Sequence, residues 1–174
     1  MKTFIQDLCS KQLAWVYQLY DIDKQCWRDL IEEIKHPLSA TPKLVIPKSA
    51  GSTTVELCVF GDASKRLYAC CAYLPCRSST SSNSRLIMAE SQLNDLEPIT
   101  ISRAELLAIL ISTRLTHYIV QQLDMSVSAI HLLSDSQVAL HWIHSSRQFR
   151  TFVQNRVDSI ENVTMSFRSH RISS

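Results

Sequence analysis

Glycine is the scarcest structural residue of this chain, because only Gly51 and Gly61 occur among its 174 residues. Glycine-rich phosphate-binding loops and the dinucleotide-binding fingerprint need several glycines at fixed spacing, so that the backbone can approach a phosphate closely. Two isolated glycines exclude both kinds of site. Proteins that hold a nucleotide through such a loop are therefore not expected here.

The chain also lacks a strong net charge, a secretory signal and paired cysteines. A formal net charge of +2 with 45% hydrophobic residues excludes disorder for most of the chain. Residues 1–7 have no apolar signal core, and the densest apolar stretch, residues 104–111, is too short to span a bilayer. The six cysteines form no CxxC pair. We therefore expect reduced thiols in an intracellular protein, either cytoplasmic or nuclear.

Proline marks the main change along the chain. Apolar residues in the first 35 positions follow helical spacing, and three prolines then punctuate residues 37–47. We expect residues 1–50 to form a helical connection segment with a proline-punctuated linker. Because that segment is too small to fold alone, residues 51–174 are expected to form the main domain.

The main domain is expected to alternate between strands and helices. Residues 55–60 are apolar on both parities, which is typical of a central strand. Further strands are predicted at residues 67–74, 85–89, 129–133 and 163–167, and helices at residues 102–120, 136–143 and 149–161. This order predicts an α/β fold, with a mixed sheet and helices on its faces.

Three acidic residues stand at the ends of predicted elements. Asp62 follows the first strand, Asp135 follows the strand at 129–133, and Glu105 lies in the first turn of the long helix. If the two strands are parallel neighbours, their carboxyl ends share one rim of the sheet. Clustered carboxylates repel one another unless cations neutralise them, and oxygen ligands suit Mg²⁺ or Mn²⁺. Two such ions about 4 Å apart can activate water and stabilise the leaving oxygen of a phosphodiester.

Each acid also has a local explanation. Glu105 would complete a capping box begun by Ser102, Asp135 would favour a helix N-terminus within a second box over residues 134–137, and Asp62 would form an Asx-turn. Any one of these explanations is sufficient for a single residue. Three acids aimed at one rim are harder to explain by capping alone, which favours a shared metal site.

The C-terminal part of the chain is locally basic. Residues 146–174 hold five arginines against two acids. Arg147, Arg150 and Arg156, on the helical segment after the one that follows Asp135, are candidate nucleic-acid-binding residues, and a solvated helix face is the alternative. The pairs His141–His144 and Cys71–Cys76 lack a second pair for zinc, so structural roles are expected for them.

Three ordered segments carry a resemblance to a known family. Residues 59–64, 99–106 and 133–136 resemble the BEL/Pao retrotransposon polyprotein, in its ribonuclease-H-like region just downstream of the reverse transcriptase. Residues 86–89, 140–143 and 152–157 support the resemblance, and residues 4–8, with Trp15 and Trp27, are similar to the reverse-transcriptase connection.

The resemblance implies a ribonuclease-H-like fold. It implies that Asp62, Glu105 and Asp135 are catalytic and hold two Mg²⁺ (or Mn²⁺) ions, while water attacks the RNA strand of an RNA–DNA hybrid. The implied partners are this hybrid or another nucleic acid and the upstream reverse transcriptase of the same polyprotein, with no membrane involved.

The chain departs from the family pattern at its C-terminal end. Ribonuclease H sites usually carry a fourth acid on a helix after the last strand, and this sequence supplies none before Ser174. We therefore expect a C-terminally truncated fold with weak or absent cleavage. The alternative hypothesis is a catalytically inactive remnant that acts as a structural or nucleic-acid-binding module.

Overall fold

The chain divides into two compact units, Met1–Pro47 and Lys48–Ser174. The computed structural model describes residues 1–12, 16–35, 54–79, 81–95, 97, 99–123 and 125–170, without the side chains of 168–170. Trp15 and the linker predicted before residue 51 lie outside the described residues.

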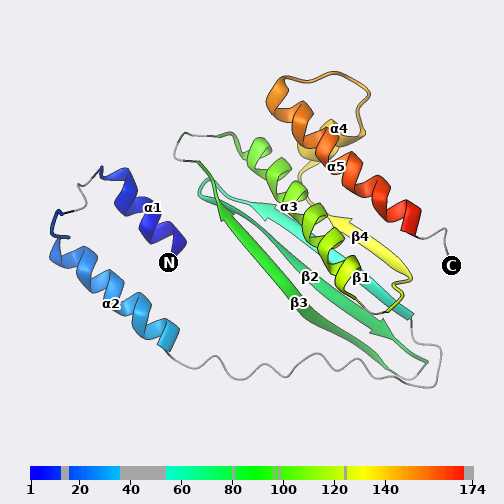
Figure 1. Cartoon of the computed structure of the whole chain (residues 1–174), viewed down its shortest axis with the longest axis horizontal. Helices are drawn as coiled ribbons and strands as arrows, with labels where there is room; N and C mark the ends of the chain where they lie inside the picture. Colours follow the sequence, from blue (N-terminus) through cyan, green and yellow to red (C-terminus); the bar gives the residue numbers. More distant parts are fainter. Residues whose placement is uncertain are drawn as a thin grey trace. The chain divides into compact units, whose positions relative to one another are not determined.

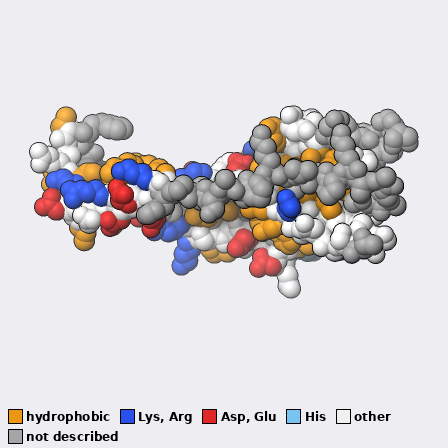
Figure 2. Space-filling view, turned by 90° about the horizontal axis from the view of Figure 1, so that it is seen from below, with side chains coloured by type: hydrophobic (Ala, Val, Ile, Leu, Met, Phe, Trp, Pro, Cys, Tyr) orange, Lys and Arg blue, Asp and Glu red, His pale blue; other side chains and the backbone are white. Residues whose placement is uncertain are grey.

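The first unit contains two helices, α1 (Lys2–Ser10) and α2 (Asp21–Lys35), as the helical spacing predicts. The rings of Phe4 and Trp27 stack at 5.9 Å between centroids. Lys11 Nζ donates to both carboxylate oxygens of Asp23 at 2.8 Å. Figure 2 shows basic and acidic side chains interspersed on this unit.

The second unit is built on a four-stranded mixed sheet of order β3-β2-β1-β4 (Figure 1). Its strands are β1 (Thr54–Ala63), β2 (Leu67–Arg77), β3 (Ser82–Leu93) and β4 (Ala129–Leu133). The pairs β1–β2 and β2–β3 are antiparallel, and β1–β4 is parallel. The parallel pairing on which the shared rim depends is therefore present. Phe60 of β1 pairs with Leu133 of β4, so Asp62 and Asp135 follow the same rung of the ladder.

One long helix, α3 (Ile101–Gln122), lies across a face of the sheet (Figure 1). One side of α3 packs against the inward residues of β1 and β2, such as Leu57, Val59 and Leu74. Its other side forms a second cluster with α4 (Gln137–His144) and α5 (Thr151–His170). Most residues of α3 from Ala104 to Ile119 are therefore buried. None of the described helices is both long enough and apolar enough to cross a membrane.

The second cluster explains the apolar spacing of α5. Val153, Val157 and Ile160 of α5 are buried against α3 and α4, at spacings that place them on one helix face. Trp142 packs into the same cluster, with its ring 6.4 Å from that of Phe149. These contacts fix the helix that follows α4.

The strand predicted at 163–167 is wrong, because these residues continue α5. The Thr164 hydroxyl donates to the Ile160 carbonyl one turn earlier, and Phe167 reaches His117 of α3 with 5.9 Å between ring centroids. A five-residue alternation was too short to distinguish a strand from the end of a helix already anchored on α3.

The arrangement of the helices also differs from the prediction. The described helices of this unit gather on one face of the sheet, rather than on both (Figure 1). Side chains on the opposite face stay open, with Phe60 and Leu133 exposed by 44% and 42%.

Gly61 lies at a close approach between β1 and α3. A Cβ added at this residue would lie 2.5 Å from the Ser112 hydroxyl and 3.0 Å from the Ala108 carbonyl oxygen. Ser112 is itself buried, and its hydroxyl donates to that carbonyl at 2.7 Å. Only glycine fits here without displacing α3.

We expect Gly61→Ala to lower the free energy of unfolding by about 1–3 kcal/mol, the usual cost of overpacking a core. Ser112→Ala should restore part of this loss in the double variant, because it removes the nearer of the two clashing atoms. Chemical denaturation of the four proteins of this double-mutant cycle measures the coupling. Strictly additive effects would contradict a direct contact between the new methyl group and Ser112.

Candidate metal centre

Three carboxylates converge at the rim where β1 and β4 end. Asp62 is the penultimate residue of β1, Asp135 follows β4, and Glu105 projects from the beginning of α3. One oxygen from each carboxylate lies within 4.8 Å of the others. The parallel β1–β4 pairing accounts for the two aspartates, and the crossing of α3 over the sheet brings Glu105 to them.

The predicted capping boxes are absent at both Glu105 and Asp135. The N-cap of α3 is Thr100, so Ser102 lies inside the helix and cannot begin a capping box with Glu105. The N-cap of α4 is Ser136, whose hydroxyl accepts from the Ala139 amide at 3.3 Å. Asp135 precedes that cap and is exposed. Capping therefore accounts for neither acid, although Asp135 lies beside the N-terminus of α4, where the helix dipole favours a negative charge.

Asp62 is bound locally, although not in the turn that was predicted. It belongs to β1, where it is paired with Ala69 of β2, and its Oδ1 accepts from the Ala63 amide at 2.7 Å. This bond fixes one carboxylate oxygen and leaves the exposed group available at the rim.

Glu105 is the buried member of the group. Only 7% of its surface is exposed, and its Oε2 atom has no hydrogen-bond partner in the structure. Burial raises the pKa of Glu105, the charges of Asp62 and Asp135 raise it further, and a hydrogen bond from the Ala63 backbone opposes the shift. A buried carboxylate oxygen without a donor is costly, so this atom requires a positive ligand or a proton.

The rim is open to a ligand. A hollow of about 390 Å³ is lined by Phe60, Gly61, Asp62, Leu133, Ser134 and Asp135. The sequence indicated Ser134 only as the start of a capping box and not as a site residue, although its place between a strand and an acid was a usable signal. The hollow brings two exposed carboxylates and a hydroxyl within reach of a ligand from solvent.

The chemistry of the donors fits a hard divalent cation. All three groups offer oxygen, the ligand type that Mg²⁺ takes in proteins. The unpartnered Glu105 oxygen is a further sign of fit, since a cation would satisfy it. Among the described residues, no other set of three metal-ligating side chains comes together.

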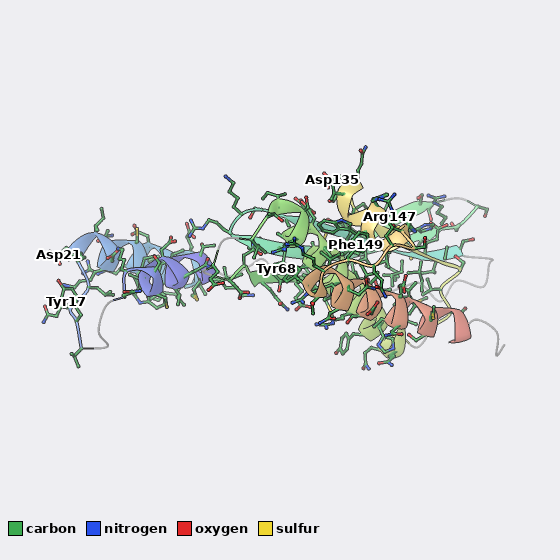
Figure 3. The ribbon with its side chains drawn as sticks, turned by 90° about the horizontal axis from the view of Figure 1, so that it is seen from above. Tyr17, Asp21, Tyr68, Asp135, Arg147 and Phe149 are labelled. Atoms are coloured by element: carbon green, nitrogen blue, oxygen red, sulfur yellow. The ribbon has the colours of Figure 1, made fainter. Side chains whose placement is uncertain are left out.

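The predicted basic residues belong to two different elements of the fold. Arg147 and Arg150 are exposed in the loop between α4 and α5, whereas Arg156 is a half-buried residue of α5. Figure 3 shows Arg147 and Phe149 in that loop. The Arg156 guanidinium stacks on the Phe152 ring, 3.9 Å from its centroid. The sequence placed the three arginines on one helical segment. In the structure they do not share one helix face.

Comparison with known proteins gives one family match and several similar folds. The model of the family described as "Pao retrotransposon-like RNaseH-like domain" matches residues 1–136. No curated protein matches the chain.

Two of the similar solved structures are RNase H1 enzymes that are distant from this chain in sequence. RNase H1 from the halophilic archaeon Halobacterium salinarum NRC-1 is 12% identical over 64% of this chain and 77% of its own, with a TM-score of 0.40. LC11-RNase H1 in complex with an RNA/DNA hybrid is 12% identical over 65% of this chain and 78% of its own, with a TM-score of 0.39.

The family match covers most of the chain and includes all three acids of the rim. It also agrees with the mixed sheet and its covering helix, which define the α/β architecture. The chain therefore belongs to the family of Pao retrotransposon-like RNase H-like domains.

Proposed function

We propose that this domain binds Mg²⁺ or Mn²⁺ through Asp62, Glu105 and Asp135 and hydrolyses the RNA strand of RNA–DNA hybrids. The observation that carries the proposal is the meeting of three carboxylates at one rim, with a buried Glu105 oxygen that lacks a donor. Capping does not explain Glu105 or Asp135, and the family assignment agrees with an RNase H-like site.

The residues of the rim have different roles in the proposed reaction. Divalent cations in such sites activate water and stabilise the leaving oxygen of a phosphodiester. Glu105 is fixed by α3 and supplies a ligand from the protein side, while Asp62 and Asp135 are exposed toward the substrate. Phe60 and Leu133 flank the acids and are partly exposed, so they offer apolar contact to a sugar or base.

A second candidate is a hybrid-binding module without activity. The acidic group contains three carboxylates among the described residues, whereas a complete site usually holds four. A missing ligand would weaken the hold on one ion, and hydrolysis that needs both ions would then be slow. The cleavage experiment below separates the two candidates.

The chain is further proposed to act as part of a retrotransposon polyprotein, beside its reverse transcriptase. The family match supports this context, because it extends from the first unit into the RNase H-like domain. Residues 1–50 would then be the connection between the two enzymes. The six free cysteines support an intracellular location, cytoplasmic or nuclear.

Cleavage of a labelled RNA–DNA hybrid tests the activity. We expect weak cleavage that is greater in Mn²⁺ than in Mg²⁺, because Mg²⁺ demands near-ideal octahedral ligands and suffers most from an incomplete set. Asp62→Asn should reduce the rate by at least about 100-fold through loss of a metal ligand. Asp95→Asn removes an exposed acid outside the group and serves as the matched control.

The outcomes of this assay are distinct. Cleavage that is lost in Asp62→Asn and kept in Asp95→Asn supports the enzyme. Cation-dependent stabilisation without cleavage supports the inactive module. If neither cation raises the melting temperature, the metal site itself is refuted.

The raised pKa of Glu105 predicts how stability depends on pH without metal. Below the ordinary glutamate pKa the group is protonated in both states and costs nothing. As pH rises toward the raised folded value, the unfolded chain ionises first, so stability is lost. Glu105→Gln should therefore raise the free energy of unfolding at pH 7 and leave it unchanged at acidic pH.

Without metal, Glu105→Gln is expected to be the more stable protein at pH 7. Added metal should make the wild-type chain the more stable one, because only the wild-type chain offers the Glu105 carboxylate as a ligand. Thermal unfolding in EDTA and in Mg²⁺ from pH 4 to pH 8 measures both effects, with the exposed Glu161→Gln as control. If Glu105→Gln is less stable than wild type in EDTA at pH 7, the ionised Glu105 carboxylate does not destabilise the folded chain.

Salt dependence tests the proposed role in nucleic-acid binding of Arg147 and Arg150, the two exposed members of the three candidate arginines. Each arginine that holds a phosphate contributes about 0.9 to the slope of log K against log salt. Replacing Arg147 and Arg150 by Gln should therefore flatten that slope, measured with an uncleavable hybrid. Arg85→Gln, near the opposite ends of β2 and β3, is the control, and equal slopes would assign the loop arginines to a solvated surface.

A further inference from the structure

A second hollow lies between α3, α5 and the adjoining parts of β2 and β3. Its volume is about 300 Å³, and it shares no lining residue with the acidic hollow at the rim. Leu107, Leu110 and Ile111 of α3 give it an apolar wall. The remaining lining side chains are polar or charged, among them Tyr68, Gln92, Arg114 and Arg156. Figure 3 shows Tyr68 on the side where α5 begins.

Two guanidinium groups line this hollow from different helices. Arg156 of α5 is held in place, because one of its nitrogens donates to the Phe152 carbonyl at 3.2 Å while its plane stacks on the Phe152 ring. Arg114 is an exposed residue in an otherwise buried stretch of α3. Among the described residues, neither arginine forms an ion pair with an acid. The hollow therefore carries two positive charges that the protein leaves uncompensated within it.

On the strand side of the hollow, the side-chain amide of Gln92 forms hydrogen bonds with two neighbouring side chains. The Tyr68 hydroxyl donates to Gln92 Oε1 at 2.7 Å, and Gln92 Nε2 donates to Glu90 Oε1 at 2.8 Å. The acids near Tyr68 are Glu90 and Asp95, and neither lines the hollow. One Glu90 oxygen is engaged on the strand side, and no ion pair joins Glu90 to Arg114 or Arg156 among the described residues.

We propose that this hollow is a binding site for the phosphate group of a nucleotide. Guanidinium groups match the oxygens of a phosphate and bind it through charge-assisted hydrogen bonds. The hollow is larger than a bare phosphate requires and is at the lower end of the range for small-ligand pockets. The apolar wall of α3 is then left to contact the sugar or base.

Two kinds of ligand carry such a phosphate, a free nucleoside monophosphate and the phosphorylated end of a nucleic-acid strand. Both bring a phosphate dianion attached to an apolar body. The site is formed by other residues than the metal centre, so it does not depend on catalysis by the rim.

Calorimetric titration of the full chain with AMP, in EDTA, tests the proposal. We expect AMP to bind more tightly than inorganic phosphate, because only AMP reaches the apolar wall. Arg114→Gln and Arg156→Gln should each weaken AMP binding about tenfold or more, as expected for a lost hydrogen bond to a charged group. Arg85→Gln, which removes an exposed arginine elsewhere, should bind as wild type does.

Three further measurements make the result decisive. Because Arg114 is exposed, its replacement should leave the melting temperature unchanged, which separates lost binding from lost folding. Asp62→Asn should retain AMP binding, so failure of the metal centre and failure of this site are distinguishable. A trinucleotide with a 5′-phosphate that displaces AMP, where the unphosphorylated form does not, identifies the strand end as the source, whereas no displacement identifies the free nucleotide.

Several outcomes would overturn the proposal. These are no heat of binding at millimolar AMP, equal affinity in wild type and Arg114→Gln, or loss of AMP binding in Asp62→Asn. The last result would move the phosphate to the rim of the sheet.

Discussion

Mutual repulsion among three carboxylates is the main energetic cost that the rest of this domain must offset. Their oxygens lie within 4.8 Å of one another, and one of them belongs to a residue that is nearly buried. Burial and like charge both raise the pKa of Glu105, so the folded chain holds this group at a cost. A protein tolerates such a cost where a ligand relieves it, and the proposed divalent cation would do so for all three acids together.

The helix α3 supplies the stability that offsets this cost. It buries one side against β1 and β2 and the other against α4 and α5, so it forms the centre of two apolar clusters. Its approach to β1 requires glycine at position 61, because a side chain there would meet Ser112 and the Ala108 carbonyl. One of the two glycines of the chain is therefore placed where the helix that carries Glu105 is positioned against the strand that carries Asp62.

The same helix separates opposite charges. Its beginning carries Glu105 to the acidic rim, and Arg114 further along lines a hollow with Arg156 of α5. The guanidinium groups of Arg103 and Arg156 both lie over the Phe152 ring, 5.0 Å and 3.9 Å from its centroid. Cation–π contacts of this kind hold arginines in place without neutralising them. Positive charge thus remains available on the helical side of a sheet whose rim is negative.

The sequence by itself determined the strands of the sheet, the long buried helix and the three acids, because hydrophobic periodicity and element ends are local properties of a chain. It did not determine how far α5 extends, since the alternation at 163–167 was overridden by contacts of Val157, Ile160 and Phe167 with other helices. Nor did it show that Thr100 and Ser136 are the caps, because a capping box depends on where a helix begins in space. The hollow lined by Arg114 and Arg156 was not predicted from the sequence. Arg114, a charged residue within an otherwise apolar helix, was a signal that this position had a special role. Only the tertiary structure brings residues of α3, α5 and two strands together, because packing rather than sequence distance decides which side chains meet.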